Sequence, residues 1–230
     1  SHERYNTPVL YPLDRELERS LDPDGTDLFE LIDGDRKPVS TQLVRDDDDT
    51  YLAWILEGKT PAGTTRTFEL ARAIAGSSES DLSVACTMQE KTLDIRSGEH
   101  LVLSYWFDEK YPPEGIDPHY RRSGFIHPLN SPSGATLTRI QPPDHYHHYG
   151  LWNPWTHTLF RGDTIDFWNL KLEEGTVRSE GVENCTGGEV MGRFSALHEH
   201  IDLPEEGEEE TVALLEKWEV DVWPLGERGD

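Results

Sequence analysis

The sequence predicts an all-β protein, built as an antiparallel β-sandwich with few or no helices. Segments that are rich in β-branched and aromatic residues, or that alternate apolar with polar residues, recur roughly every 10 to 16 residues, a spacing typical of a sandwich. Turn-forming pairs, among them Asp24-Gly25, Asp33-Gly34 and Ser97-Gly98, separate these segments. Apart from residues 211–220, no stretch has the 3.6-residue apolar period of a helix.

Residues 1–107 are predicted to form an N-terminal β-layer. The expected strands are residues 9–11, 28–32, 50–57, 65–73, 83–89 and 100–107. Residues 15–21 can form one or two helical turns, and the acidic run 46–49 is expected to be a solvated loop.

Residues 108–230 are predicted to form the main β-sandwich unit, joined to the first part by a proline-rich stretch at 108–118. The expected strands are residues 135–140, 146–152, 163–172, 175–183, 189–200 and 209–223. The last of these also fits an amphipathic helix, but Val220, Val222 and Trp223 favour a long strand. A sheet that ends on this strand leaves an unpaired edge, so we expect further residues after Asp230, or a partner chain such as a second copy.

The composition limits the function classes. A net charge of −24 without a basic stripe disfavours nucleic-acid binding. The chain has no run of about 18 apolar residues that would predict a membrane span. It also opens without an apolar leader, and we therefore expect a cytoplasmic protein. The 45 acidic residues stand against only 21 Lys and Arg, mostly Arg, which indicates a halophilic protein that works in high salt; the alternative is an ordinary acidic bacterial protein.

The two cysteines, Cys86 and Cys185, lie far apart in the sequence and form no metal-binding motif. They can form one disulfide, but we expect two buried thiols, as is usual for a lone pair in a chain of this size.

Residues 144–152 concentrate the chemistry of the chain. Three histidines, His145, His147 and His148, follow Asp144, and imidazole is the side chain that titrates near neutral pH. In an extended segment, His145, His147 and Tyr149 share one face, so we expect His145 and His147 in a cleft and His148 packed inward. His127, on a proline-rich loop, is expected to join the cleft. The alternative is that these histidines bond loop backbone and stack on tryptophans.

Two kinds of chemistry fit this segment. Acid/base catalysis is favoured: Asp144 would orient His145 or His148 as the proton carrier, while Arg139 and His127 bind the substrate. A divalent metal is the alternative. The candidate ligands are two pairs with matching i, i+2 spacing, His145 with His147 and His198 with His200. No Gly-x-Ser-x-Gly elbow, P-loop or dinucleotide fingerprint is present.

Tryptophans surround the histidines. Trp152, Trp155 and Trp168 are candidate substrate-binding residues, because flat rings beside polar groups are typical of sugar sites. The alternative is that they belong to the core of the sandwich.

Several blocks, in order and at their expected spacing, resemble the soluble domain family called PmoA-like. They are Ser123-Gly124-Phe125-Ile126-His127-Pro128-Leu129, Ser131-Pro132-Ser133-Gly134, Leu137-Thr138-Arg139, Pro143-Asp144-His145-Tyr146-His147-His148-Tyr149-Gly150-Leu151-Trp152 and Asp166-Phe167-Trp168, with weaker likeness at 39–42 and 63–70. Tyr149 departs from the family, in which an Arg is common at this place. Family members also usually continue for about another hundred residues.

The resemblance implies a β-sandwich similar to the galactose-mutarotase-like supersandwich, in prokaryotes that process sugars. It carries over the same site residues: His127, Arg139, Asp144, His145, His147 and His148. The family's alternative label, methane oxygenase, suggests a metal-dependent oxidoreductase. We therefore expect a carbohydrate-processing protein of the hydrolase, lyase or epimerase type; the first alternative is a non-catalytic sugar-binding or structural module, and the second is the oxidoreductase.

Overall fold

The protein is an all-β chain of antiparallel sheets, as the sequence predicts. The computed structural model describes residues 2–21, 26–46, 49–72, 84–203 and 209–224. In this part of the chain there are fifteen strands, one α-helix of six residues, α1 (Arg15–Ser20), and two 3-10 helices. None of these helices has the length and apolar character needed to cross a membrane.

The chain divides into two compact units. Unit 1 consists of Ser1–Val84, Gly187–Met191 and Trp223–Asp230, and unit 2 of Ala85–Thr186 and Gly192–Val222. The predicted boundary between residues 107 and 108 lies inside unit 2, between β9 (His100–Trp106) and the 3-10 helix η1 (Pro118–Tyr120).

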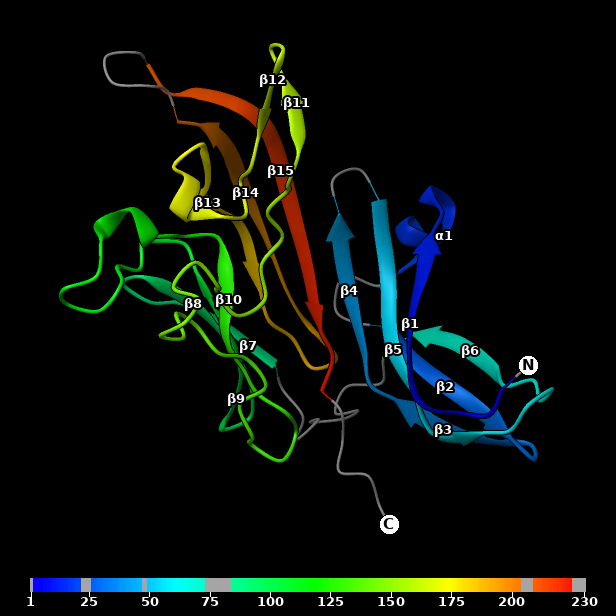
Figure 1. Cartoon of the computed structure of the whole chain (residues 1–230). Helices are drawn as coiled ribbons and strands as arrows, with labels where there is room; N and C mark the ends of the chain where they lie inside the picture. The colour runs from blue at the N-terminus through cyan, green and yellow to red at the C-terminus, as the bar shows by residue number, and fades with distance from the viewer. Residues whose placement is uncertain (1, 22–25, 47–48, 73–83, 204–208, 225–230) are drawn as a thin grey trace. The chain divides into compact units, whose positions relative to one another are not determined.

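Unit 1 contains two three-stranded antiparallel sheets (Figure 1). The first has the order β1 (Arg4–Leu13), β5 (Asp49–Thr60), β4 (Thr41–Asp46), and the second β3 (Asp35–Val39), β2 (Thr26–Ile32), β6 (Thr67–Arg72). The buried side chains of Leu28 from β2 and of Leu52 and Trp54 from β5 form a shared apolar core. Leu52 and Trp54 lie on one face of β5 because side chains alternate along a strand.

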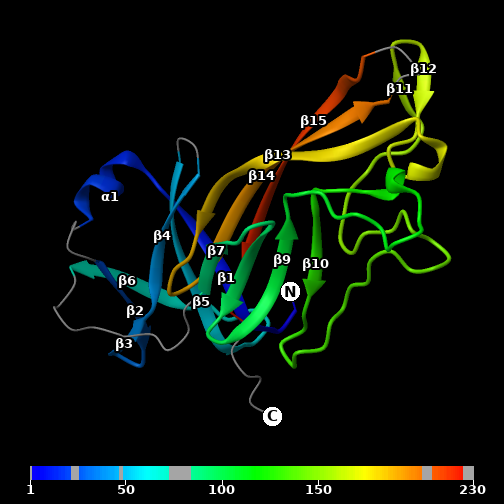
Figure 2. The same ribbon diagram turned by 90° about the vertical axis from the view of Figure 1, so that its left-hand side faces the viewer.

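Unit 2 contains three long strands that lie side by side in Figures 1 and 2. One sheet has the order β13 (Gly175–Thr186), β14 (Gly192–Asp202), β15 (Thr211–Val222), and another β10 (Phe125–Leu129), β9, β8 (Thr92–Ser97), β7 (Val84–Met88). A hairpin of β11 (Thr158–Phe160) and β12 (Asp163–Ile165) and the 3-10 helix η2 (Leu170–Leu172) complete the unit. Among the described residues β15 is an edge strand, so the expected partner at this edge stays a prediction.

The two larger sheets of unit 2 pack against each other through Tyr105. Its ring, fully buried on β9, contacts Phe194 and His198 of β14 and Trp218 of β15, with ring centroids 5.0, 5.9 and 6.3 Å away. Its hydroxyl lies 2.9 Å from the hydroxyl of Ser179 on β13. Unit 2 is therefore a sandwich of two antiparallel sheets.

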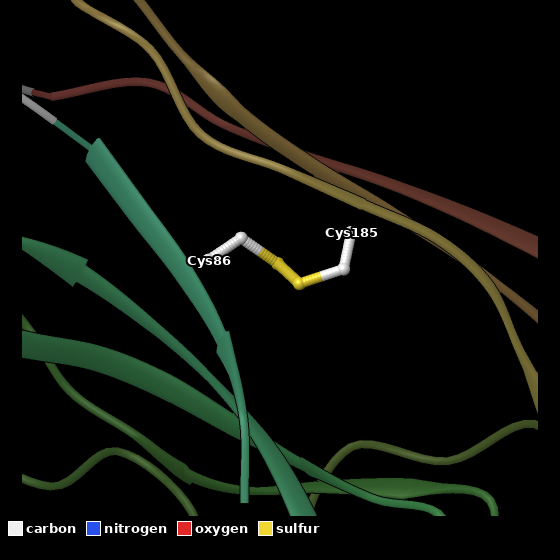
Figure 3. Close-up of a disulfide and its surroundings, with 2 residues drawn as sticks. All are labelled: Cys86 and Cys185. Atoms are coloured by element: carbon white, nitrogen blue, oxygen red, sulfur yellow. A yellow bond between two sulfur atoms is a disulfide. The ribbon is translucent and has the colours of Figure 1, made fainter.

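A disulfide between Cys86 on β7 and Cys185 on β13 also links these sheets (Figure 3). The expectation of two buried thiols was therefore wrong. Sheet packing brings the two Cα atoms to 5.7 Å, a normal distance for a bridge, although 99 residues separate the cysteines.

Other differences from the predicted elements concern strand limits. Residues 135–140 form only isolated bridges, at Thr136 and Ile140, and only the start of 163–172 is a strand. Residues 146–152 are not a strand, because turns interrupt them. Residues 211–222 form a strand rather than a helix, as preferred. Of the acidic run 46–49, Asp49 begins β5, while residues 47 and 48 lie outside the described part of the chain.

Candidate functional site

The histidine-rich segment lies in the loop between β10 and β11 of unit 2. Its backbone turns twice: the His145 amide donates to the Pro142 carbonyl (2.8 Å), and the His148 amide donates to the His145 carbonyl (3.1 Å). After these turns Tyr149 pairs with Ile140 and is fully buried. The predicted strand at this place was wrong, and the exposed His145 does not share a face with the buried Tyr149.

Gly150 attaches this segment to β10. Ile126 on β10 and Leu151, the residue after Gly150, exchange backbone hydrogen bonds of 2.9 and 3.0 Å. Gly150 has a φ of +50°, and a Cβ atom here would lie 2.3 Å from the Ile126 carbonyl oxygen. Only glycine allows this close approach of the two backbones.

The three imidazoles and two indoles form one group, which we call the histidine–tryptophan cluster: His145, His147, His148, Trp152 and Trp168. The ring centroids of the histidine pairs 145–147, 145–148 and 147–148 are 5.6, 5.0 and 4.4 Å apart. The His148 ring also lies 6.1 Å from Trp152 and 6.0 Å from Trp168. The turns thus gather side chains that an extended strand would send to opposite faces.

Asp144 holds the ring of His145. Its Oδ2 atom lies 3.1 Å from His145 Nδ1, and its Oδ1 atom lies 3.8 Å from Nη2 of Arg139. Hydrogen bonds from its own backbone amide, then from His145, lower the pKa of Asp144. An ionised carboxylate at this place can orient the imidazole. The predicted role of the two residues as an acid/base pair stays a prediction. The side chains of Asp144 and His145 are 73 and 51 % exposed, so this pair lies at the surface.

His147 and His148 are kept neutral by their surroundings. Burial, then the charges of His148 and His145, lowers the pKa of His147. Burial, then His145, lowers the pKa of His148, against an opposing effect of Asp144. Neutral imidazoles can accept a proton at neutral pH, which is what a general base requires.

Two of the three candidate tryptophans come together. The rings of Trp152 and Trp168 are 4.7 Å apart. Trp155 is 56 % exposed, and in the described residues its ring contacts neither of the other two. The indole pair and the adjacent imidazoles offer the combination of apolar ring faces and polar groups that sugars bind.

His127 lies on β10, half-buried, and precedes a cis peptide bond to Pro128. Its Nδ1 atom is 2.9 Å from the hydroxyl of Thr138. Burial, then the charge of Lys110, lowers the pKa of His127. Within the described chain, no ring contact joins it to the three cluster histidines, so its predicted place in their site stays a prediction.

His198 and His200 form a second, buried group on β14. Both side chains are directed to one carboxylate oxygen: His198 Nδ1 and His200 Nε2 each lie 3.3 Å from Oε2 of Glu216 on β15. The other ring nitrogen of His198 is 2.7 Å from the Tyr105 hydroxyl, and Asn153 Nδ2 donates to Oε1 of Glu216 (2.7 Å). These contacts form a continuous hydrogen-bonded chain from Tyr105 to Glu216.

Burial controls the charges in this group. It lowers the pKa of His200 to about 4 and raises the pKa of Tyr105. Burial also acts to raise the pKa of Glu216, but hydrogen bonds from His198 and then Asn153 outweigh it, so the pKa is lowered. A Glu216 carboxylate with neutral His200 is the form expected at neutral pH.

The four candidate metal ligands do not gather at one point. In the ranges that the structure describes, no three His, Cys, Asp or Glu side chains come together as a group suited to hold a metal ion. His198 and His200 instead bond Glu216, while His145 and His147 belong to the histidine–tryptophan cluster.

The sequence analysis missed two residues that shape these groups, Glu216 and Arg122. A signal for Glu216 was present: it occupies the inward face of β15 with Leu214 and Trp218, where apolar residues are expected. Arg122 lies in a stretch without periodicity, yet it is only 2 % exposed and lies over Trp152, with 4.5 Å between the guanidinium carbon and the ring centroid.

Comparison with known proteins gives a family but no described activity. No curated protein and no solved structure matches the chain. Residues 92–229, more than half of the chain, match a family described as being of unknown function, DUF6807. This range contains the histidine–tryptophan cluster and the buried His198 and His200. Because the match covers more than half of the chain, the chain belongs to the DUF6807 family.

Proposed function

We propose that unit 2 binds a carbohydrate at the histidine–tryptophan cluster and acts on it by histidine acid/base chemistry. One observation carries this proposal: the His148 ring contacts two indoles and two imidazoles at once. The indole faces supply a platform for the apolar face of a sugar ring, and the imidazoles can move a proton of a hydroxyl or a glycosidic oxygen.

The roles follow from the surroundings of each ring. His148, with its lowered pKa and its contacts to both indoles, is the proposed general base. His145 is the proposed acid, because its Nδ1 atom lies 3.1 Å from Oδ2 of the Asp144 carboxylate, which can orient the ring. Arg139, near Oδ1 of Asp144, orients the carboxylate rather than the substrate.

The resemblance to the PmoA-like family supports the same location, since its blocks include residues 123–152 and 166–168. It favours a hydrolase, lyase or epimerase of sugars, and a fold like that of galactose mutarotase. These finer assignments rest on the resemblance alone.

A second candidate function is sugar binding without turnover. The large exposure of Asp144 and His145 favours it, because catalytic groups usually act in sites that exclude water. In that case the same surface binds the sugar, and no proton is transferred.

The test measures binding and turnover on the whole chain. Tryptophan fluorescence titrations with glucose, galactose and their methyl glycosides report binding, and nitrophenyl glycosides with proton NMR of the free sugars report hydrolysis and epimerisation. His148→Ala is expected to lower kcat/KM by about 100-fold or more, the usual contribution of a general base. The matched control is His157→Ala, an exposed histidine outside the cluster.

The outcomes separate the candidates. Turnover that survives in His148→Ala excludes the assigned base. Binding by the wild type without any turnover, lost in Trp152→Ala, supports the binding module. Activity abolished by a chelator would instead favour a metal-dependent mechanism.

A further inference from the structure

Arg122 is a buried cation without a counter-ion in the described part of the chain. Its side chain is almost completely buried, yet none of the ion pairs found among the described residues includes Arg122. One guanidinium nitrogen, Nη1, donates to the Phe167 carbonyl at 3.3 Å, and Nε is buried with no hydrogen-bond partner. Burying an unpaired charge destabilises the folded state, so stability does not explain an arginine at this position.

The nearby ionisable groups do not act as the counter-ion of Arg122. Glu216 and Tyr149 attract the charge of Arg122, but neither forms an ion pair with it. Glu216 is already bonded by His198, His200 and Asn153. Burial lowers the pKa of Arg122 to about 9, which still leaves it charged at neutral pH.

Trp152 connects Arg122 with the proposed sugar site. The guanidinium lies over the Trp152 ring, and the same ring contacts Trp168 at 4.7 Å and His148 at 6.1 Å. The charge of Arg122 also acts on His147, a member of the cluster. The Trp152 ring therefore contacts both Arg122 and the histidine–tryptophan cluster.

We infer that the ligand of the histidine–tryptophan cluster is an acidic sugar, such as a uronate, whose carboxylate is the missing counter-ion of Arg122. The planar guanidinium suits a carboxylate because it can donate two parallel hydrogen bonds. This inference rests on the proposed function, since it names the substrate class of the same site.

The experiment compares sugars that differ only in the carboxylate. Dissociation constants for glucuronate and glucose, and for galacturonate and galactose, are measured by tryptophan fluorescence at constant sodium concentration. The wild type should bind each uronate about 10- to 100-fold more tightly than its neutral partner, the effect of a hydrogen bond to a charged group.

Variants then assign the preference to Arg122. Arg122→Met should remove it, so that the variant binds each uronate no more tightly than its neutral partner. If Arg122→Met does not fold, Arg122→Lys gives the same reading, because lysine keeps the charge but cannot form the paired hydrogen bonds, and the preference should fall about tenfold. The matched control is Arg161→Met, an exposed arginine that also lies over an aromatic ring, Phe160, at 5.1 Å.

Equal binding of acidic and neutral sugars by the wild type, or a uronate preference that survives both Arg122 variants, overturns the inference and leaves the proposed function standing. If the wild type binds none of the four sugars, the proposed function itself fails.

Discussion

The imidazole of His147 meets that of His148 edge to face, with ring centroids 4.4 Å apart. Two rings at this distance resist holding a proton each, because like charges repel strongly in a partly buried place. The pair is therefore expected to accept one proton rather than two, and the lowered pKa values of both rings favour the neutral form. A single general base with a neutral neighbour is the chemistry that this arrangement favours.

Stability should fall as the solution becomes mildly acidic. The pKa of His200 is depressed to about 4 in the folded state, so below its ordinary value of 6.5 the unfolded chain binds a proton that the folded chain does not. The stability present at pH 7 is thus lost as the pH falls, by about 2 kcal/mol between pH 7 and pH 5. Urea unfolding at several pH values measures it.

The control for this pH dependence is a pair of variants. His200→Gln keeps an N–H donor for Glu216 and should flatten the pH profile, whereas His157→Gln, on the exposed loop, should leave the profile unchanged. A wild-type free energy of unfolding that stays constant from pH 7 to pH 5 contradicts the depressed pKa.

High salt should stabilise the protein. At a net charge of −24, repulsion among carboxylates opposes the folded state, and molar KCl screens it. We expect a higher Tm in about 2 M KCl than in dilute buffer. Differential scanning calorimetry in both solutions is the measurement, and a Tm that stays the same or drops would remove the halophilic assignment.

Gly150→Ala should destabilise unit 2 by more than about 1 kcal/mol, since the new methyl group would press on the Ile126 carbonyl oxygen in a left-handed backbone. Gly134→Ala is the matched control: Gly134 also has a positive φ, +85°, but nothing lies within 4 Å of its Cβ position. Chemical denaturation should show the larger loss at Gly150. Equal losses would mean that backbone conformation, rather than the close approach to β10, requires glycine there.

Loss of the Cys86–Cys185 bridge should lower stability by about 2–4 kcal/mol, because the bridge limits the freedom of the unfolded chain. The double variant Cys86→Ser/Cys185→Ser and the reduced wild type should unfold at the same urea concentration. Thiol titration of the unreduced protein that finds two free thiols would show that the bridge does not form.

The sequence was sufficient for the parts of the structure that depend on local patterns. Alternation of apolar residues located the long strands of both units, including residues 211–222. It failed at residues 146–152, where backbone hydrogen bonds at His145 and His148 close two turns that no apolar pattern announces. The disulfide could not be assigned either, since the proximity of Cys86 and Cys185 arises only when two sheets pack.

The candidate site was predictable in composition but not in geometry. The concentration of histidines and tryptophans marked the segment, and the structure brings His145, His147, His148, Trp152 and Trp168 together. Contacts between residues far apart in the sequence could not be predicted. The guanidinium of Arg122 lies over the Trp152 ring, 30 residues later in the sequence, and this contact exists only in the folded chain.

The Glu216 carboxylate determines which residues of β14 and β15 can pair with one another. Glu216 stands directly opposite His198. A slip of one residue would place Leu215 or Lys217 there and turn Glu216 toward the other face of the sheet, because strand side chains alternate. Leucine and valine on the inner face tolerate such a slip, but two buried imidazoles left without their carboxylate do not. One acid on the otherwise apolar inner face of β15 thus fixes the register in which the sheet can form.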